Sequence, residues 1–533
     1  MVVPTTHDVT LERALCRVRD PFVVRTRGDG HELREVEPGE GDWAGPGSSA
    51  GRVVGFLPPC LPEFLGDRTF CADHGVKYPY ASGAMANGIG SAEIAEAMGR
   101  AGMLGVFGAA GLPIRAVEAA IDRLGRTLGA AALPYGFNLI HSPGEPDLEA
   151  AVADLYLRRG VRLVEASAYL DLTLPVVRYR VKGLRLDETG RVVAANRVMA
   201  KVSRVEVASK FLAPPPEKFL RALVAAGEVS AEQAEWAARV PMADDVTAEA
   251  DSGGHTDNQP AVVLLPTMLA LRDRLHAQYG YDRPPRVGAA GGVSTPWAAA
   301  AAFAMGAAYV VVGSVNQGCV ESGTSDAVRA MLAQARQADI AMAPAADMFE
   351  MGVKVQVLKR GTMFAMRAAK LFETYRAHDG LDAIPAADRA ALEKTIFRAP
   401  LETIWDQTRA YFEARDPAQN ARAGRDPKHK MALVFRWYLG QSSHWANAGE
   451  PSRAVDYQVW CGPAMAAFNE WVKGSFLEPP GERRVVTVAL NILYGAAVLG
   501  RARALAGQGV AVPAGVPGLA PLGRAEVEAR ISP

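Results

Sequence analysis

The sequence has no surplus of charge of either sign, because its 533 residues include 58 basic and 58 acidic side chains. This balance argues against nucleic acid as the main ligand, since binding to a phosphate backbone requires a basic excess. Disorder is also excluded as the main state, because 49% of the residues are hydrophobic and 22% are charged. The composition is that of a globular protein with a large core.

Cysteine is scarce as well. No two cysteines lie at Cys-x-x-Cys spacing, which predicts neither a disulfide framework nor a metal site and favours a reducing compartment. The five cysteines are Cys16, Cys60, Cys71, Cys319 and Cys461.

Long hydrophobic runs are also missing. The two longest apolar stretches, Trp297–Gly313 and Val485–Gly500, each fall short of a membrane span and are interrupted by Gly or Asn. The N-terminal stretch reaches an acidic residue at Asp8 and has no apolar core of a signal peptide. We therefore expect a cytoplasmic protein without a membrane span.

Glycine, in contrast, is abundant, at 52 of 533 residues, against an average of about 7%. From Tyr80 onward, short apolar segments alternate with Gly- or Ser-rich turns and Ala-rich amphipathic segments. This alternation is typical of parallel βαβ units, and eight such units predict an α/β fold, a TIM (β/α)8 barrel with helical insertions. The predicted strands are Tyr80–Met85, Leu104–Gly108, Tyr135–Ile140, Val161–Ala166, Arg197–Val202, Asp245–Ala250, Arg286–Ala290 and Tyr309–Gly313.

The composition predicts four regions along the chain. In order, they are an N-terminal appendage that is partly β (1–50), the barrel (51–375) with insertions at 170–195 and 211–243, a helical subdomain (376–480), and a C-terminal helix and tail (481–533). The helical subdomain holds five of the eight tryptophans, and core packing is their favoured interpretation. A hydrophobic channel for an acyl chain is the less favoured alternative. These tryptophans are Trp405, Trp437, Trp445, Trp460 and Trp471.

The active site of a TIM barrel lies on the loops after the C-terminal ends of the strands. After the first strand, the small residues around Met85, Ala86 and Asn87 would let the backbone lie against a planar ring. A Rossmann fingerprint that starts at Gly88 is disfavoured, because Glu93 stands where the third glycine would be.

Two polar side chains stand at the ends of later strands. Asn138 could donate and accept hydrogen bonds at the edge of a heterocycle, although Asn at a strand end is more often a turn residue. Lys201 would face an anion or an electron-rich ring, or would extend to water, and the sequence leaves these two alternatives even.

The loop after the sixth strand holds the best candidate for a general acid or base. Gly253 and Gly254 would bring the backbone close to a ligand, and the imidazole of His255 titrates near neutrality. The alternative is that His255 lies in a flexible polar loop. His141 and His74 are weaker candidates.

Glycine turns also follow the seventh and eighth strands. Gly291 and Gly292 stand after the seventh strand, and Gly313 and Ser314 after the eighth. Turns at these positions form the usual phosphate site of the fold, which is built from backbone N–H groups and a helix N-terminus. Together they predict a ligand that carries a phosphate group.

The order of these motifs resembles that of FMN-dependent barrels of the 2-nitropropane dioxygenase (nitronate monooxygenase) type, through AMANGIGSAEIAEAMGRAGMLGVFGAAG, YGFNLI, ADSGGH, AAGGVS and VVGS. A more specific likeness is to PfaD-type proteins, the trans-acting enoyl reductases of polyunsaturated fatty acid and polyketide synthases. It rests on VRYRVKGL, MAKVSRVEVASKF, EADSGGHTDNQP, MGVKVQVLKRGTMFAMRAAKLFETY and FRWYLGQSSHWAN, and it includes the helical C-terminal part.

The resemblance implies FMN at the barrel mouth and NADPH or NADH as the reductant. Hydride would pass through FMN to the β-carbon of an α,β-unsaturated thioester, and His255 would protonate the α-carbon. Asp251 stands where relatives often have Glu, and it would either orient His255 or cap the loop. The residues implied at the cofactor are Met85, Ala86 and Asn87 beside the ring, Asn138 and Lys201 at its polar edge, Gly253 and Gly254 in the histidine loop, and Gly291, Gly292, Gly313 and Ser314 at the phosphate.

The same resemblance implies an acyl carrier protein domain of a polyketide or polyunsaturated fatty acid synthase as the partner. Carrier proteins are acidic, so two basic clusters are candidate docking faces, although surface charges are more often only solvated. A homodimer is an open expectation, since the sequence does not decide the oligomeric state. The clusters are Lys354, Lys359, Arg360, Arg367 and Lys370, and Arg178, Arg180 and Lys182.

Two alternatives stay open at this point. A nitronate monooxygenase-like FMN oxidase would share the fold and the cofactor, and a non-catalytic barrel subunit of a synthase complex would keep the barrel for structure alone. We favour the enoyl reductase because the chain has the PfaD-like segments, and because His255, Asn138 and both glycine turns are present.

Overall fold

The computed structural model describes residues 10–27, 30–36, 52–143, 145–512, 515–516 and 519–532. Parts of the predicted appendage at 1–50 therefore lie outside the described residues, namely 1–9, 28–29 and 37–50.

Eight parallel strands close into a barrel in the order β10-β11-β13-β14-β4-β5-β6-β7. All eight predicted strands are confirmed, and with them the TIM-barrel fold. The predictions for β4 and β14 run too long, because the chain leaves the barrel there into glycine-containing loops. The strands are β4 (Tyr80–Ser82), β5 (Leu104–Phe107), β6 (Gly136–Ile140), β7 (Leu163–Ser167), β10 (Arg197–Val202), β11 (Asp245–Glu249), β13 (Arg286–Ala290) and β14 (Val310–Val312).

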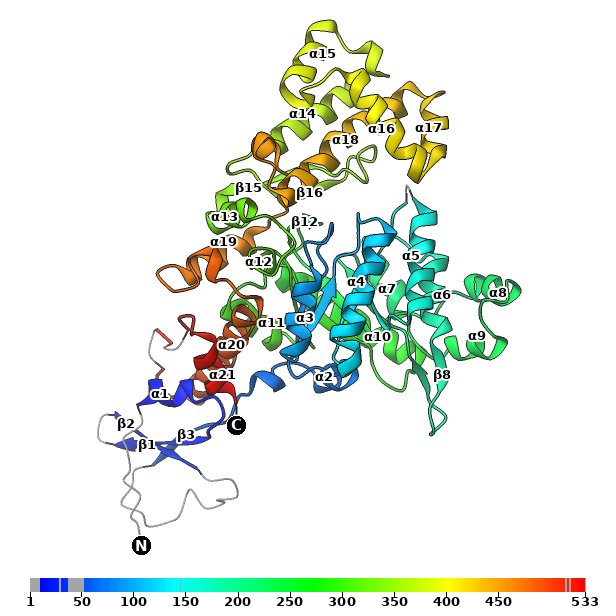
Figure 1. The fold of residues 1–533 in the computed structure, drawn as a ribbon. Coiled ribbons are helices and arrows are strands. Elements are labelled where there is room, and N and C mark those ends of the chain that lie inside the picture. The colour runs from blue at the N-terminus through cyan, green and yellow to red at the C-terminus, as the bar shows by residue number, and fades with distance from the viewer. Residues whose placement is uncertain are drawn as a thin grey trace.

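Helices surround the barrel, and most of them connect successive strands (Figure 1). Local signals set their ends: the Ser91 hydroxyl accepts a hydrogen bond from the Ile94 N–H at the start of α3, and Gly160 ends α5 in the left-handed conformation. These helices are α2 (Arg68–His74), α3 (Ala92–Arg100), α4 (Ile114–Thr127), α5 (Pro146–Arg159), α7 (Val205–Leu212), α10 (Ala261–Tyr279), α11 (Pro296–Ala304), α12 (Ser314–Gln317) and α13 (Asp326–Ala333).

Further elements interrupt the barrel between β7 and β11. They lie on the side of the barrel away from the N-terminal sheet (Figure 1). In chain order they are α6 (Leu174–Lys182), the antiparallel pair β8 (Leu184–Leu186) and β9 (Val192–Ala194), α8 (Glu217–Ala225) and α9 (Ala231–Ala237).

A second group of helices lies over the C-terminal mouth of the barrel (Figure 1). A hairpin leads into it and pairs with a short strand of the barrel loops, in the order β12-β16-β15. Phe364, Phe397 and Phe435 belong to a separate hydrophobic core inside this group. The elements are β12 (Gly254–His255), β15 (Ile340–Pro344), β16 (Lys354–Leu358), α14 (Phe364–Ala377), α15 (Ala386–Leu392), α16 (Leu401–Arg415), α17 (Pro417–Ala423) and α18 (Pro427–Ala448). Helix α19 (Pro463–Val472) follows them in the chain but packs against the barrel core and α12 and α13.

The tryptophans of this region serve mainly as packing residues, as the favoured interpretation has it. Trp405, Trp437, Trp445 and Trp460 pack against the core of the helical group. Trp471 packs against the barrel core instead, and its indole Nε1 donates to the Leu519 carbonyl at 2.7 Å.

Helix α20 (Val485–Gly507) is the apolar helix predicted near the C-terminus. It continues to Gly507, so its length suffices to cross a membrane, and the expectation that this stretch falls short is wrong. However, 94% of its most apolar 18-residue window is buried inside the protein. It packs against α11, α3 and α1 (Leu11–Cys16), while α21 (Arg524–Ile531) packs on it. It also contacts β3 (Val53–Leu57), an edge strand of the N-terminal sheet that β1 (Phe22–Arg27) and β2 (Gly30–Glu35) complete. Burial in the core therefore accounts for its apolar composition.

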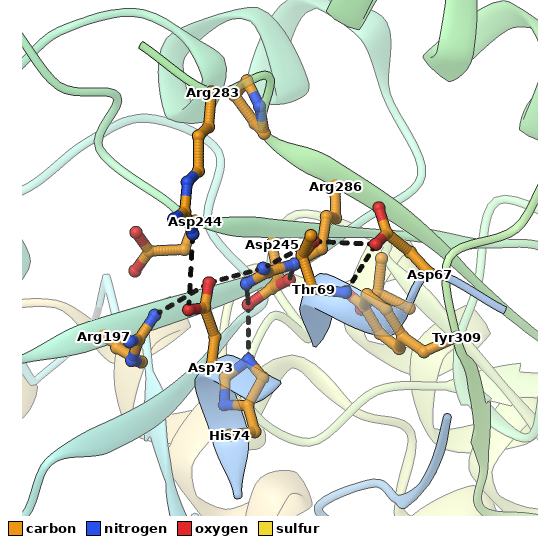
Figure 2. A network of polar contacts seen from close by, with 12 residues as sticks. Asp67, Thr69, Asp73, His74, Arg197, Asp244, Asp245, Arg283, Arg286 and Tyr309 are labelled. Atoms are coloured by element: carbon orange, nitrogen blue, oxygen red, sulfur yellow. Dashed lines mark hydrogen bonds and ion pairs between the residues drawn. The ribbon is translucent and has the colours of Figure 1, made fainter. Parts of the chain in front are cut away.

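A buried polar network closes the N-terminal end of the barrel (Figure 2). Asp245 opens β11, and its two carboxylate oxygens accept from His74 Nε2 at 2.7 Å and from Arg286 Nε at 2.6 Å. Arg286 opens β13 and also donates to Asp73 at 2.6 Å. His74 is therefore a structural residue at the end of the barrel opposite the active-site loops, and it is removed from the acid/base candidates.

Replacing Asp245 with Asn should lower the free energy of unfolding by about 3 kcal/mol, because the buried Arg286 loses a carboxylate partner. Urea unfolding followed by circular dichroism measures this loss. Glu217→Gln is the control, since the Glu217 and Arg221 side chains are 78% and 71% exposed and should contribute less than about 1 kcal/mol. A loss for Asp245→Asn no larger than that of the control would contradict the prediction.

The pH dependence of this effect has a definite sign. Burial alone would raise the pKa of Asp245, but Arg286 and His74 outweigh burial and hold that pKa well below its usual range. The stabilisation is therefore present above the unfolded pKa of about 3.9 and is lost as the pH falls towards the lower folded value. The difference in stability between the native protein and Asp245→Asn should shrink below about pH 4.

Candidate functional site

A cavity of about 820 Å³ lies between the barrel mouth and the helical group above it. The loops after the barrel strands form its floor, and α16, α18 and the β15–β16 hairpin form its roof. The structure brings together at this cavity every residue predicted for the site. They are Met85, Ala86, Asn87, Asn138, Lys201, Gly253, Gly254, His255, Gly291, Gly292, Gly313 and Ser314.

The glycine turns after β13 and β14 leave open space in the cavity. Gly291 has φ 78°, and a Cβ there would lie 2.5 Å from the Ala250 carbonyl oxygen, so this position requires glycine. A Cβ on Gly292 or Gly313 would meet no atom within 4 Å. Ser314 is the first residue of α12, whose first N–H groups have no acceptor within the helix. This open, donor-lined backbone fits a phosphate group.

The loop after β4 reaches from the barrel to the helical group. Met85 and Ala86 line the cavity, and Asn87 has φ 57° and donates from Nδ2 to the Ser443 hydroxyl of α18 at 2.9 Å. The Asn87 amide is thus engaged by the helical group, while Met85 and Ala86 remain available to a planar ligand.

Lys201 lies between two carboxylates at the end of β10. Its Nζ is 3.4 Å from Glu165 Oε1 on β7 and 3.4 Å from Glu249 Oε1 on β11. Of the two alternatives that the sequence left even, the structure favours the first, because Lys201 faces anions and does not extend freely to water. The two carboxylates were not predicted, although an acid inside the apolar segment VRLVEASA was a visible signal for Glu165.

Burial and the neighbouring charges together set the pKa values of Glu165 and Lys201. Burial raises the pKa of the Glu165 carboxyl, and the Lys201 ammonium offsets this only in part. For Lys201, burial would lower the pKa, but Glu249 and Glu165 outweigh it and raise that pKa above its usual value. Lys201 therefore keeps its proton at neutral pH, and its ammonium is held at a fixed place.

Asn138 is buried beside this group at the end of β6. Its Nδ2 donates to the Glu165 carbonyl oxygen at 3.0 Å and to the Ser167 hydroxyl at 3.1 Å. These bonds hold the amide in place at the cavity, and they explain the residue better than a turn would, because position 138 lies within the strand.

His255 is held in an ordered element. It lies on β12, whose Gly254 and His255 pair with Gln356 and Val355 of β16, and its Nε2 is 3.1 Å from Asp347 Oδ1. The His255 side chain is 39% exposed. Burial lowers the pKa of His255, but Asp347 outweighs burial and the pKa is raised overall. The flexible-loop alternative does not describe this histidine.

Asp251 caps the loop and does not orient His255. Its Oδ1 accepts from Asn258 Nδ2 and from Gln356 Nε2, both at 2.9 Å. Gln356 also donates to the Ser252 carbonyl at 2.8 Å, so one side chain of β16 holds the whole loop. Asp347 and Gln356 are two residues that the sequence analysis missed, because both come from a hairpin that it did not predict.

Gly253 and Gly254 line the cavity and also take part in contacts within the protein. A Cβ on Gly253 would lie 2.9 Å from the backbone nitrogen of Cys461, so glycine there allows the segment before α19 to approach. Gly254 forms the bridge to Gln356. The close approach of Gly253 is to the protein itself, while the approach of both glycines to a ligand stays a prediction.

The two predicted basic clusters are largely built into the fold. Arg180 is buried and donates to Asp244 at 2.6 and 3.0 Å, while Arg178 pairs with Asp154, and Lys182 with Glu228. In the other cluster, Arg367 pairs with the buried Asp456, and Arg360 lies 3.6 Å from Asp339. Lys354, Lys359 and Lys370 are exposed. The cluster around Arg180 is therefore wrong as a docking face.

Comparisons with known proteins agree with this architecture. The family model of nitronate monooxygenase matches residues 69–391, and that of the inserted helical domain of acyl-carrier-protein S-malonyltransferase matches residues 378–457. The chain is similar to the solved enoyl reductase domain of MlnA from the macrolactin biosynthesis cluster of Bacillus amyloliquefaciens. That likeness has a TM-score of 0.79 and 41% identity, and it covers 83% of this chain and 99% of the other.

Two curated relatives are longer than this chain. One of them, from the polyunsaturated fatty acid synthase of Thraustochytrium sp., is 51% identical over 457 residues, which cover 84% of this chain and 30% of the relative. The polyketide biosynthesis protein PksE of Bacillus subtilis is 45% identical over 437 residues, which cover 82% and 56%. The chain thus spans about a third of the first relative and about half of the second.

Replacing Asp347 with Asn should lower the pKa of His255, because the carboxylate that offsets the effect of burial is removed. An NMR titration of the ring with labelled histidine measures the change. Asp251→Asn is the matched control, since Asp251 lies in the same loop but does not contact His255. An equal shift in both variants, or none in Asp347→Asn, would contradict the assignment of Asp347.

Proposed function

The chain belongs to the nitronate monooxygenase family, and from this premise we propose that it is an FMN-dependent enoyl reductase. Its substrate would be an α,β-unsaturated thioester on an acyl carrier protein, reduced in trans during polyketide or polyunsaturated fatty acid biosynthesis. The observation that carries the proposal is that one cavity contains a histidine paired with a carboxylate, an open glycine cradle and a fixed ammonium. The likeness to the solved enoyl reductase domain supports it.

The residues present fit FMN. Gly291, Gly292, Gly313 and Ser314 would bind the phosphate through backbone N–H groups, because the space before Gly292 and Gly313 is open. Met85 and Ala86 would lie beside the ring, with Asn138 and Lys201 at its polar edge. When bound, FMN supplies the hydride transfer from NADPH or NADH to the β-carbon of the enoyl group.

His255 would complete the reaction by protonating the α-carbon. Asp347 pairs with Nε2, which leaves Nδ1 as the nitrogen that delivers the proton. The raised pKa of His255 keeps a larger fraction of the ring protonated at neutral pH. The helical group above the cavity would limit the access of water to this step.

The carrier-protein partner and the synthase context belong to the proposal as well. The two curated relatives are, by their names, part of a polyunsaturated fatty acid synthase and a polyketide biosynthesis protein, so this chain would act beside carrier domains. The exposed lysines Lys354, Lys359 and Lys370 remain as candidates for contact with an acidic carrier.

An anaerobic flavin assay tests the proposal. The purified protein should carry FMN, NADPH should bleach its yellow colour, and a crotonyl thioester on a carrier protein should restore it. Gly313→Leu is the control, because the added side chain would occupy the open space before Gly313 and the protein should purify without flavin. Reduction of the oxidised flavin by a nitronate, with reoxidation by oxygen and not by the thioester, would instead support an FMN oxidase. A native protein that binds no flavin would support a non-catalytic role in a synthase complex.

His255→Gln should retain FMN and its bleaching by NADPH, but it should slow reoxidation by the crotonyl thioester about 10²-fold or more. The reason is that glutamine cannot supply the proton. Stopped-flow absorbance separates the two half-reactions. His31→Gln, at an exposed histidine of β2 outside the cavity lining, is the control and should change neither rate appreciably. An unchanged second half-reaction in His255→Gln would remove His255 from the mechanism.

A further inference from the structure

The cavity does not end at the barrel mouth but continues beneath the helical group along α18. Leu433, Trp437, Gly440 and His444 line it at intervals of three or four residues, which places them on one face of the helix. The end of this face near Ser443 adjoins the barrel, because the Ser443 hydroxyl accepts from Asn87. From Ser443 to Leu433 the helix rises by about 15 Å. The cavity therefore has an extension that leads away from the predicted flavin position.

Other parts of the cavity lining also carry large apolar side chains, beside polar ones such as Gln407 and Arg415. Tyr411 and Phe412 of α16 line the cavity, together with Met348 and Met351 of the segment between β15 and β16. Tyr411 is 53% exposed and Met351 is 63% exposed, so large apolar side chains face open space. Contiguous exposed apolar surface of this kind is typical of binding sites.

Gly440 is the position that keeps this extension open. It lies in the interior of α18, where glycine costs about 0.5–1 kcal/mol relative to alanine. No neighbouring group requires glycine there, because a Cβ would meet nothing within 4 Å. The absent side chain thus serves the volume of the cavity and not the packing of the helix.

We propose that the α18 extension binds the acyl chain of the thioester, with the reacting double bond at the barrel mouth and the end of the chain towards Leu433. This assignment rests on the proposed enoyl reductase function. It names the substrate class as long, apolar, extended acyl chains, and it makes Gly440, Trp437 and Phe412 determinants of chain length. The tryptophan-rich region is therefore both a packed core and a channel wall.

Gly440→Phe tests the proposal against Gly440→Ala as the matched control. The phenylalanine fills the extension, whereas alanine leaves most of it open. With dodecenoyl and crotonyl thioesters of the same carrier protein, Gly440→Phe should raise the KM for the dodecenoyl substrate by about tenfold or more. The KM for the crotonyl substrate should stay within about twofold of that of the native protein, because a short chain does not reach the extension.

A binding measurement keeps this test separate from the proposed function. Calorimetry with the saturated dodecanoyl and butyryl thioesters of pantetheine requires no turnover, and Gly440→Phe should weaken only the dodecanoyl complex. If the native protein binds the long chain selectively but reduces neither enoyl substrate, the proposed function fails while the channel stands. Equal effects of Gly440→Phe on both chain lengths, or none on either, would overturn the channel.

Tyr411→Glu provides a second variant should Gly440→Phe fold poorly. Tyr411 is half exposed and lines the cavity from α16, so the substitution leaves the core intact and places a charge against the acyl chain. It should weaken dodecanoyl binding about tenfold or more and leave butyryl binding unchanged. Retention of full dodecanoyl affinity in this variant would also overturn the channel.

Discussion

The pairing of β12 with β16 joins the barrel to the helical group, and the geometry of the site depends on it. The loop after β11 carries His255, but backbone bonds from Gln356 and Val355 fix its position. The side chain of Gln356 holds the rest of the loop through Asp251 and Ser252. A loop with two adjacent glycines would otherwise lose considerable conformational entropy when a ligand orders it, and here the protein has met that cost during folding.

The barrel and the floor of the site could be predicted because their signals are local. Each strand is a short apolar run that a glycine or polar turn ends, and in a barrel all such turns meet at one mouth, which is why Gly292 and Gly313 lie together. The partners of Lys201 could not be predicted with the same ease. Glu165 and Glu249 come from the strands on either side of β10, and their approach depends on the register of three strands, which residue spacing does not reveal.

Non-local contacts also decide the role of Asp251, which the sequence left open, and overturn the basic cluster around Arg180. Asp251 is near His255 in the sequence, but the carboxylate that pairs with His255 is Asp347, which belongs to a hairpin absent from the predicted strands. Arg178, Arg180 and Lys182 look like one basic cluster, yet residues two apart on a helix point in different directions. Arg180 consequently faces the interior and pairs with Asp244, and the three do not form one docking surface.

The helical group supplies three things that the barrel lacks: the acid that pairs with His255, the strand that orders its loop, and the wall of the α18 extension. All three depend on the same rigid connection between the helical group and the barrel. The hydrogen bond from Asn87 to Ser443 and the 2.6 Å ion pair of Arg415 with Glu145 reinforce this connection. A ligand that stabilises the helical group against the barrel must therefore also stabilise the ordered position of His255. One coupling free energy links ligand binding at the helical group to the ordered position of His255, so each of the two favours the other. A long acyl chain in the extension would thus favour the arrangement in which His255 is ready to deliver its proton.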